Sequence, residues 1–128
     1  MKNVLQVASA HAEWLAHRRV AIAANVANAN TPGYGAQDIA PFAAMLDRAT
    51  VHSAGSPVRS HPRHLAGAAP GQAGVEAVAG QSREMFHSGN SVNIDEEMLK
   101  AGQVTQQQSL NAGIVRVFHR LLLTSVKG

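Results

Sequence analysis

The sequence predicts a mainly α-helical fold, in which two long terminal helices form an antiparallel hairpin or coiled coil and flank an irregular middle segment. Helical apolar periodicity occupies both ends of the 128-residue chain. Proline and glycine interrupt the middle of the chain. The four expected segments are an N-terminal helix (1–30), a turn with a short helix (31–48), an irregular region (49–90) and a C-terminal helix (91–128).

The first expected helix carries a heptad seam, with positions that step alternately by three and four. The seam consists of Leu5, Ala8, Ala12, Leu15, Arg19, Ile22, Val26 and Ala29. This pattern fits a helix packed on its own domain as well as one packed against other long helices. Arg19 interrupts the seam, and its long stem favours snorkelling toward solvent over pairing with an acid. Trp14 either covers the helix edge or, if exposed, forms an assembly contact.

A turn follows this helix. Asn30 and Thr31 compete with helical hydrogen bonds, and Pro32 disfavours the α conformation in the residue before it. The helix is therefore expected to end near Ala29 or Asn30. Pro32 and Gly33 suit the centre of a type II turn, because proline presets φ and glycine accepts a positive φ.

The residues after the turn predict a short helical segment, with Pro41 tolerated near its start. Its apolar positions are Ile39, Phe42, Met45 and Leu46. Periodicity then disappears in the region 49–90, where a brief extended piece is expected only around 75–78. A long run without periodic structure argues against a compact domain and favours an extended molecule that orders in an assembly.

The C-terminal helix has a clear start signal. Asn93 is the predicted N-cap, and Glu96 follows three residues later in a box-like arrangement. Asp95, Glu96 and Glu97 lie in the first turn, where carboxylates favour the positive end of the helix dipole. Adjacent acids are expected at such a position, so we interpret them as structural and not as a catalytic pair. The helix is expected to reach about Ser125.

The second half of this helix has an apolar face broader than one antiparallel partner needs. Alanine supplies much of the 45% hydrophobic content, so a self-sufficient core is expected to be thin. The helices are therefore expected to bury further faces against other subunits through a non-closing contact. The predicted subunit interface consists of Leu5, Ala8, Ala12, Leu15, Ile22, Val26, Ala29, Leu110, Ile114, Val117, Phe118 and Leu121.

Composition argues against several classes of protein. The chain has no cysteine, which removes disulfide and thiol chemistry. The net charge of +3 comes from scattered basic residues, so nucleic-acid binding is not expected. The first 30 residues have charges where a signal peptide would be apolar, and no apolar run approaches the length of a membrane span.

A histidine-containing stretch in the middle of the chain, His61-Pro62-Arg63-His64, invites a metal interpretation with His52 as a third ligand. Pro62 lies between the two histidines, and no cysteine or acidic ligand is nearby in the sequence. We therefore predict no metal site there, and the role of His61 and His64 stays open.

The segment Asn25-Val26-Ala27-Asn28-Ala29-Asn30-Thr31-Pro32-Gly33-Tyr34 closely resembles the N-terminal signature of bacterial flagellar axial proteins, which comprise rod, hook and hook-associated families. The signature-turn residues are Asn25, Asn28, Asn30, Thr31, Pro32, Gly33 and Tyr34. The continuation Ala36, Asp38, Ile39 and Phe42 is most similar to proximal rod proteins. The pattern from Gly89 to Met98, which precedes a glutamine-rich helix, is also similar to proximal rod proteins. Gly35 departs from the family, which usually has lysine there.

The resemblance implies a structural subunit of the proximal rod of the flagellar basal body. Its terminal helices would assemble into a tubular drive shaft and export channel that spans the periplasm. The implied partners are other copies, other rod proteins, the membrane-ring and rod adapter proteins, and the type III export apparatus. The resemblance also implies export without a cleaved signal peptide. It implies no enzymatic activity and no cofactor, metal, nucleic acid or small-molecule substrate.

Two alternatives belong to other classes of protein. One is a stand-alone small helical binding module or secretion adaptor that holds a partner helix. The other is a metal-dependent or hydrolytic enzyme.

Overall fold

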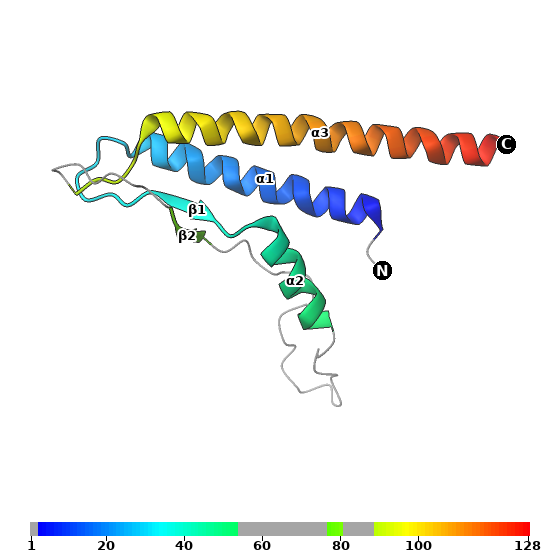
Figure 1. Ribbon diagram of the computed structural model, residues 1–128, viewed down its shortest axis with the longest axis horizontal. Coiled ribbons are helices and arrows are strands. Elements are labelled where there is room, and N and C mark those ends of the chain that lie inside the picture. The colour runs from blue at the N-terminus through cyan, green and yellow to red at the C-terminus, as the bar shows by residue number, and fades with distance from the viewer. Residues whose placement is uncertain (1–2, 54–76, 81–88) are drawn as a thin grey trace, which may run out of the picture.

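The computed structural model describes residues 3–53, 77–80 and 89–128. Its elements are α1 (Val4–Ala27), β1 (Gln37–Ile39), α2 (Phe42–Ser53), β2 (Ala77–Ala79) and α3 (Ile94–Lys127). α1 and α3 lie side by side and run in opposite directions, with β1, β2 and α2 on the other side of α1 (Figure 1). The expected mainly α fold with two long terminal helices is confirmed.

Asparagines cap both ends of α1. The side chain of Asn3 accepts the Leu5 N–H at 3.2 Å, while the Asn3 N–H donates to Gln6 Oε1 at 3.1 Å, which completes a capping box. At the other end, Asn28 Nδ2 donates to the Ala24 carbonyl at 2.8 Å. The Asn28 backbone N–H donates to the same carbonyl at 3.1 Å, and the helix ends at Ala27, slightly before the end expected near Ala29 or Asn30.

The turn after α1 has the expected form. The Tyr34 N–H donates to the Thr31 carbonyl at 3.2 Å across Pro32 and Gly33. Gly33 has φ +73°, as the third residue of a type II turn requires. Gly89 shares this positive φ and lies against Gly33, so the chain returns to the turn just before α3 begins.

The segment after the turn departs from the expected helix. Ile39 belongs to β1, which pairs antiparallel with β2 so that Gln37 faces Ala79 and Ile39 faces Ala77. A hydrogen bond of 2.8 Å from the Gly80 N–H to the Ala36 carbonyl extends this ladder. Long-range pairing therefore overrides the local helical spacing at Ile39.

The boundary expected at residue 48 is also wrong, because α2 starts at Phe42 and continues to Ser53. The extended piece expected around 75–78 overlaps β2, and its residues 75–76 lie outside the described residues.

The hydrophobic core lies where α1 meets β1, α2 and α3. Its buried members are Trp14, Leu15, Ile22, Ile39 and Val104. Trp14 Nε1 also donates to the Ala40 carbonyl at 2.8 Å, so both its apolar body and its polar tip are satisfied inside the chain. Trp14 therefore covers the helix edge. The alternative, in which an exposed Trp14 forms an assembly contact, is wrong.

α3 starts as predicted, because Asn93 Oδ1 accepts the N–H groups of Asp95 at 3.0 Å and Glu96 at 3.4 Å. The helix is longer than expected and reaches Lys127. The register with α1 is marked by Asn111 Nδ2, which donates to the Ala8 carbonyl at 2.9 Å.

α3 has 34 residues and α1 has 24, so the C-terminal end of α3 projects past the start of α1 by roughly 15 Å (Figure 1). We call residues 118–127 the overhang. Within the described ranges, no helix has the length and hydropathy of a membrane span.

Candidate assembly site

Asn90 closes the C-terminal end of α1. Its Nδ2 shares two hydrogens among the carbonyls of Asn28 (3.1 Å), Ala29 (2.6 Å) and Thr31 (3.0 Å). Asn90 Oδ1 accepts the Val92 N–H at 2.8 Å. The last carbonyls of a helix have no partner within it, so this buried amide satisfies groups that would otherwise be unpaired.

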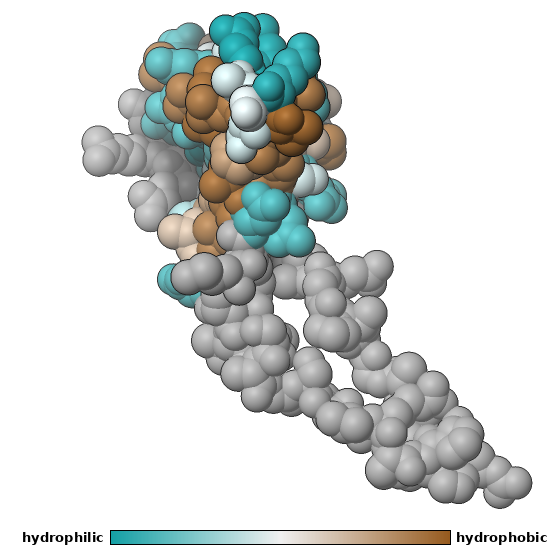
Figure 2. All heavy atoms as spheres, turned by 90° about the vertical axis from the view of Figure 1, so that its right-hand side faces the viewer, coloured by the Kyte–Doolittle hydropathy of each residue, from teal (hydrophilic) through white to brown (hydrophobic). Residues whose placement is uncertain are grey.

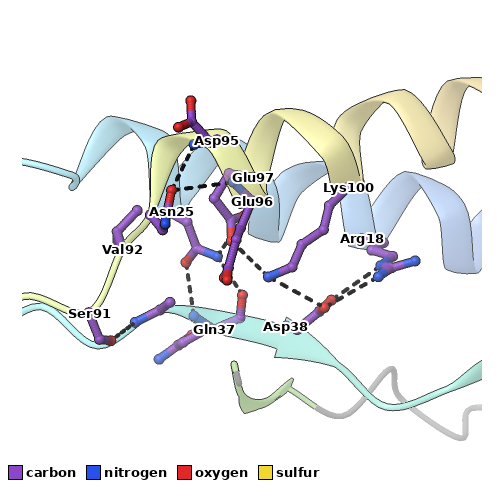
Figure 3. Close-up of polar contacts among 12 residues, drawn as sticks. Arg18, Asn25, Gln37, Asp38, Ser91, Val92, Asp95, Glu96, Glu97 and Lys100 are labelled. Carbon is purple, nitrogen blue, oxygen red and sulfur yellow. Dashed lines mark hydrogen bonds and ion pairs between the residues drawn. The ribbon is translucent and has the colours of Figure 1, made fainter. Parts of the chain in front are cut away.

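Asn25 joins α1 to both β1 and α3. Its Oδ1 accepts the Gln37 N–H at 2.9 Å, and its Nδ2 donates to the Gln37 carbonyl at 2.6 Å and to Glu97 Oε2 at 3.0 Å (Figure 3). The side chain thus makes with Gln37 the paired bonds of a neighbouring strand. Asn25 is 0% exposed, and Tyr34 Oη donates to its Oδ1 at 3.5 Å. The amide of Asn25 supplies both the acceptor and the donors that these contacts with β1 and α3 require.

A chain of charges continues from Glu97. Glu97 is 1% exposed, and its Oε1 accepts from Lys100 Nζ at 2.8 Å. Lys100 Nζ also lies 4.0 Å from Asp38 Oδ2, and Arg18 donates to both Asp38 oxygens at 3.3 and 3.4 Å (Figure 3). A buried carboxylate is tolerated when it is paired and hydrogen-bonded. Glu97 Oε2 therefore connects α3 to α1, and Oε1 holds Lys100 of the same helix in place beside Asp38 of β1.

The signature residues lie in two different environments. Asn25, Asn28 and Tyr34 make hydrogen bonds within the chain, whereas the tip of the turn (Asn30, Thr31, Pro32 and Gly33) is exposed. We call the hydrogen-bonded group of Asn25, Asn28, Asn90 and Glu97 the closed end of the hairpin. Sequence reasoning missed Asn90 and Glu97 as members of this group.

A sequence signal for Glu97 exists. Glu97, Val104 and Asn111 step by seven, as do Ala8, Leu15 and Ile22 on α1. Residues at that spacing share one face of a helix, and here these two faces meet. Asn90 precedes the helix, and no periodicity could have indicated it.

The predicted interface residues divide between two environments. Ala8, Leu15 and Ile22 are buried inside the chain itself, and Leu5, Val26, Ala29 and Phe118 are half-buried. Ala12 is exposed, and so is the interrupting Arg19, which donates to Gln108 of α3 and snorkels as expected. The exposed large side chains of the predicted set all belong to α3: Leu110, Ile114, Val117 and Leu121.

These four side chains form one apolar surface. Together with Gly113 and Phe118 they line a shallow groove on α3. Figure 2 looks onto the C-terminal end of α3 and shows hydrophobic side chains reaching the surface there. Leu121 is 62% exposed and belongs to the overhang, so the apolar surface extends into it. Contiguous apolar surface of this kind is typical of faces that contact another molecule.

The metal interpretation gains no support from the described residues, among which no group of three potential ligands is close enough to hold an ion. His61 and His64 lie outside them, and so does the side chain of His52.

The fold and the site define a structural protein: a helical hairpin with a hydrogen-bonded closed end and an uncovered apolar face. Residues 18–34, which include the signature turn, match the family described as flagella basal body rod protein. The chain is also 40% identical over 127 residues to the flagellar basal body rod protein FlgB of Agrobacterium fabrum strain C58, covering 98% of this chain and 93% of that protein.

The chain belongs to the flagellar basal body rod protein family. It is a structural subunit of the rod, in a family of structural proteins and not of enzymes. The resemblance drawn from the signature residues is confirmed.

Proposed function

We propose that this chain builds the proximal part of the rod, and that it assembles through the apolar face of α3 into a tubular drive shaft and export channel. The proposal is carried by one observation: Leu110, Ile114, Val117 and Leu121 are exposed along one face of a helix whose opposite face packs on α1 through Val104. The similarity to a flagellar basal body rod protein supports a place in the rod, and the resemblance of the signature residues to proximal rod proteins supports the proximal position.

Part of the apolar surface of α3 is left uncovered in the single chain. Full burial of a leucine, isoleucine or valine contributes about 1.5–3 kcal/mol. Leu110 is 64% exposed and Val117 is 58% exposed, so much of that contribution is unused in the single chain. The overhang continues a helix that is already nucleated, but helical stability in proteins comes mostly from packing of an apolar face, and the overhang extends past the start of α1. Contacts with neighbouring subunits supply the missing burial.

We propose as partners other copies of the chain, other rod proteins, and the membrane-ring and adapter proteins at the base of the rod. The rod then spans the periplasm. We further propose that the type III export apparatus delivers the chain without removing a signal peptide. In support, α1 supplies Trp14, Leu15 and Ile22 to the core, so cleavage within α1 would remove part of the fold.

The test replaces Val117 and Leu121 by serine in a strain that lacks its own copy of the gene. We expect loss of motility and of assembled rods, while circular dichroism of the purified variant stays that of the wild type. The matched control is Gln106→Ser, at an exposed polar position of the same helix, which should swim normally.

Normal motility of the double variant would contradict the proposed function. A compact monomer that melts cooperatively and binds a partner helix would favour the stand-alone binding module or secretion adaptor.

A further inference from the structure

Charge is segregated along α3. Asp95, Glu96 and Glu97 stand in the first turn, and from Met98 to Lys127 the helix contains neither aspartate nor glutamate. Because Glu97 is buried and bound to Lys100, the acids that face outward are Asp95 and, in part, Glu96. The opposite end of the helix carries exposed cations at Arg116, Arg120 and Lys127.

Exposed apolar side chains accompany both charged ends. At the start of α3, Met98 and Leu99 are 56% and 69% exposed. At its end, Val117 and Leu121 are exposed beside Arg116 and Arg120.

Both groups lie on the outward side of α3. A helix advances about 100° per residue. Asp95 therefore lies opposite Val104, which packs on α1, and Arg120 lies within a few tens of degrees of the same outward direction. We call Asp95, Met98 and Leu99 the acidic patch, and Arg116, Val117, Arg120 and Leu121 the basic patch.

We propose that these two patches bind each other between copies of the chain, so that the end of α3 in one subunit lies along the start of α3 in the next. The inference rests on the proposed function and specifies its contact between like subunits. Val117 and Leu121 cover Met98 and Leu99. Arg116 and Arg120 face Asp95, with the partly exposed Glu96 at the edge of the acidic patch. Within one chain Met98 and Leu121 are roughly 35 Å apart along the helix, so the patches cannot meet in the same molecule.

This contact is heterologous, because two different surfaces meet and each copy keeps one of each free. Such a contact continues from subunit to subunit and does not close at a dimer. Charge complementarity disfavours a parallel alignment in register, which would place arginine near arginine. An antiparallel pair would join both patches at once and close as a dimer, whereas a continuous rod requires the staggered parallel alignment.

A basic amphipathic helix also suits an anionic membrane surface. The second copy is the better occupant, because a lipid surface would leave the acidic patch with its exposed Met98 and Leu99 unaccounted for.

Paired cysteines test the contact, and the wild-type chain has none to interfere. Met98→Cys and Leu121→Cys are placed together in the full chain, which is then oxidised at increasing concentration. We expect a ladder of disulfide-linked multimers. The matched control pairs Leu121→Cys with Thr105→Cys, an exposed position between the patches, and should give no ladder above background. A product that stops at the dimer, or no product beyond the control, would overturn the proposal.

Charge reversal tests the complementarity. In the paired-cysteine background, Arg116→Glu with Arg120→Glu should raise the chain concentration needed for half-maximal crosslinking about tenfold, because like charges then meet. Asp95→Lys with Glu96→Lys should raise it by a similar factor for the same reason. An equimolar mixture of the two reversed variants should restore the ladder. Glu13→Lys, an exposed reversal on α1, should leave it unchanged. Failure of the mixture to restore crosslinking would refute the pairing of patches.

Two further outcomes separate the alternatives. Binding of the wild type to phosphatidylglycerol vesicles, together with no ladder from the Met98→Cys, Leu121→Cys variant in solution, would overturn the contact between copies in favour of a membrane contact. If the Arg116→Glu, Arg120→Glu variant builds rods in cells while the Val117→Ser, Leu121→Ser variant does not, this inference fails and the proposed function stands.

Discussion

The closed end of the hairpin and the overhang belong to the same pair of helices but are stabilised in different ways. At the closed end, buried amides and a carboxylate connect α1, β1 and α3, and Asn25 and Glu97 are almost inaccessible to solvent. At the overhang, α3 runs past α1 with its leucines exposed. One end is complete within the chain, and the other leaves apolar side chains uncovered.

This difference predicts that the closed end determines folding of the chain and that the overhang takes part in assembly. Directional hydrogen bonds between buried groups specify one arrangement, because leaving any of them unpaired is costly. Apolar contact is less directional and suits a surface that several neighbours share. Substitutions at the closed end should therefore change folding of the free chain, and those on the overhang should change assembly alone.

The largest effect on folding is expected at Trp14. Trp14→Ala removes the largest member of the core and its hydrogen bond to Ala40. We expect the free energy of unfolding to fall by about 3–5 kcal/mol, measured by urea denaturation followed by circular dichroism. Val20→Ala shortens an exposed side chain of the same helix and should have little effect. Equal losses in the two variants would contradict the core assignment.

The next effect is expected at Asn25. Asn25→Ala leaves the Gln37 backbone groups and Glu97 Oε2 without their partner in a buried position. The expected loss is about 2–4 kcal/mol. Asn30→Ala changes the same residue type at the exposed tip of the turn and should stay close to the wild type. If Asn30→Ala proved as costly as Asn25→Ala, the closed end would not be the stabilising region.

Local signals in the sequence predicted much of the fold. The N-cap at Asn93, the turn at Pro32-Gly33 and the seam at Leu15 and Ile22 all follow from rules that involve neighbours within one or two helical turns. The structure confirms each of them.

The missed features depend on residues far apart in the chain. Ile39 was placed in a helix because its spacing to Phe42 is helical, whereas its backbone pairs with Ala77. Asn90 bonds to the end of α1 about sixty residues earlier. Glu97 looked like one of three equivalent acids, and only the approach of α1 distinguishes it.

A smaller effect sharpens the role of Asn90, which acts as a donor. Asn90→Asp is isosteric but places a carboxylate against the carbonyls of Asn28, Ala29 and Thr31. It should cost about 1–3 kcal/mol. The same substitution at Asn93 keeps the acceptor that caps α3, so Asn93→Asp should lie within about 0.5 kcal/mol of the wild type. A reversed order of the two variants, measured by urea denaturation, would refute the donor role.

The smallest effect on the free chain is expected in the overhang. Leu123 is 52% exposed, so Leu123→Ser removes little buried area and should change the free energy of unfolding by no more than about 0.5 kcal/mol. The same change at Leu15, which is fully buried, should be among the most destabilising. Hydrogen exchange locates the difference: amides of the overhang should exchange rapidly in the free chain and become protected in assembled rods, since their burial comes only from neighbours. Strong protection of these amides in the free monomer would show that the overhang is stable alone, and the contrast between the two ends would then disappear.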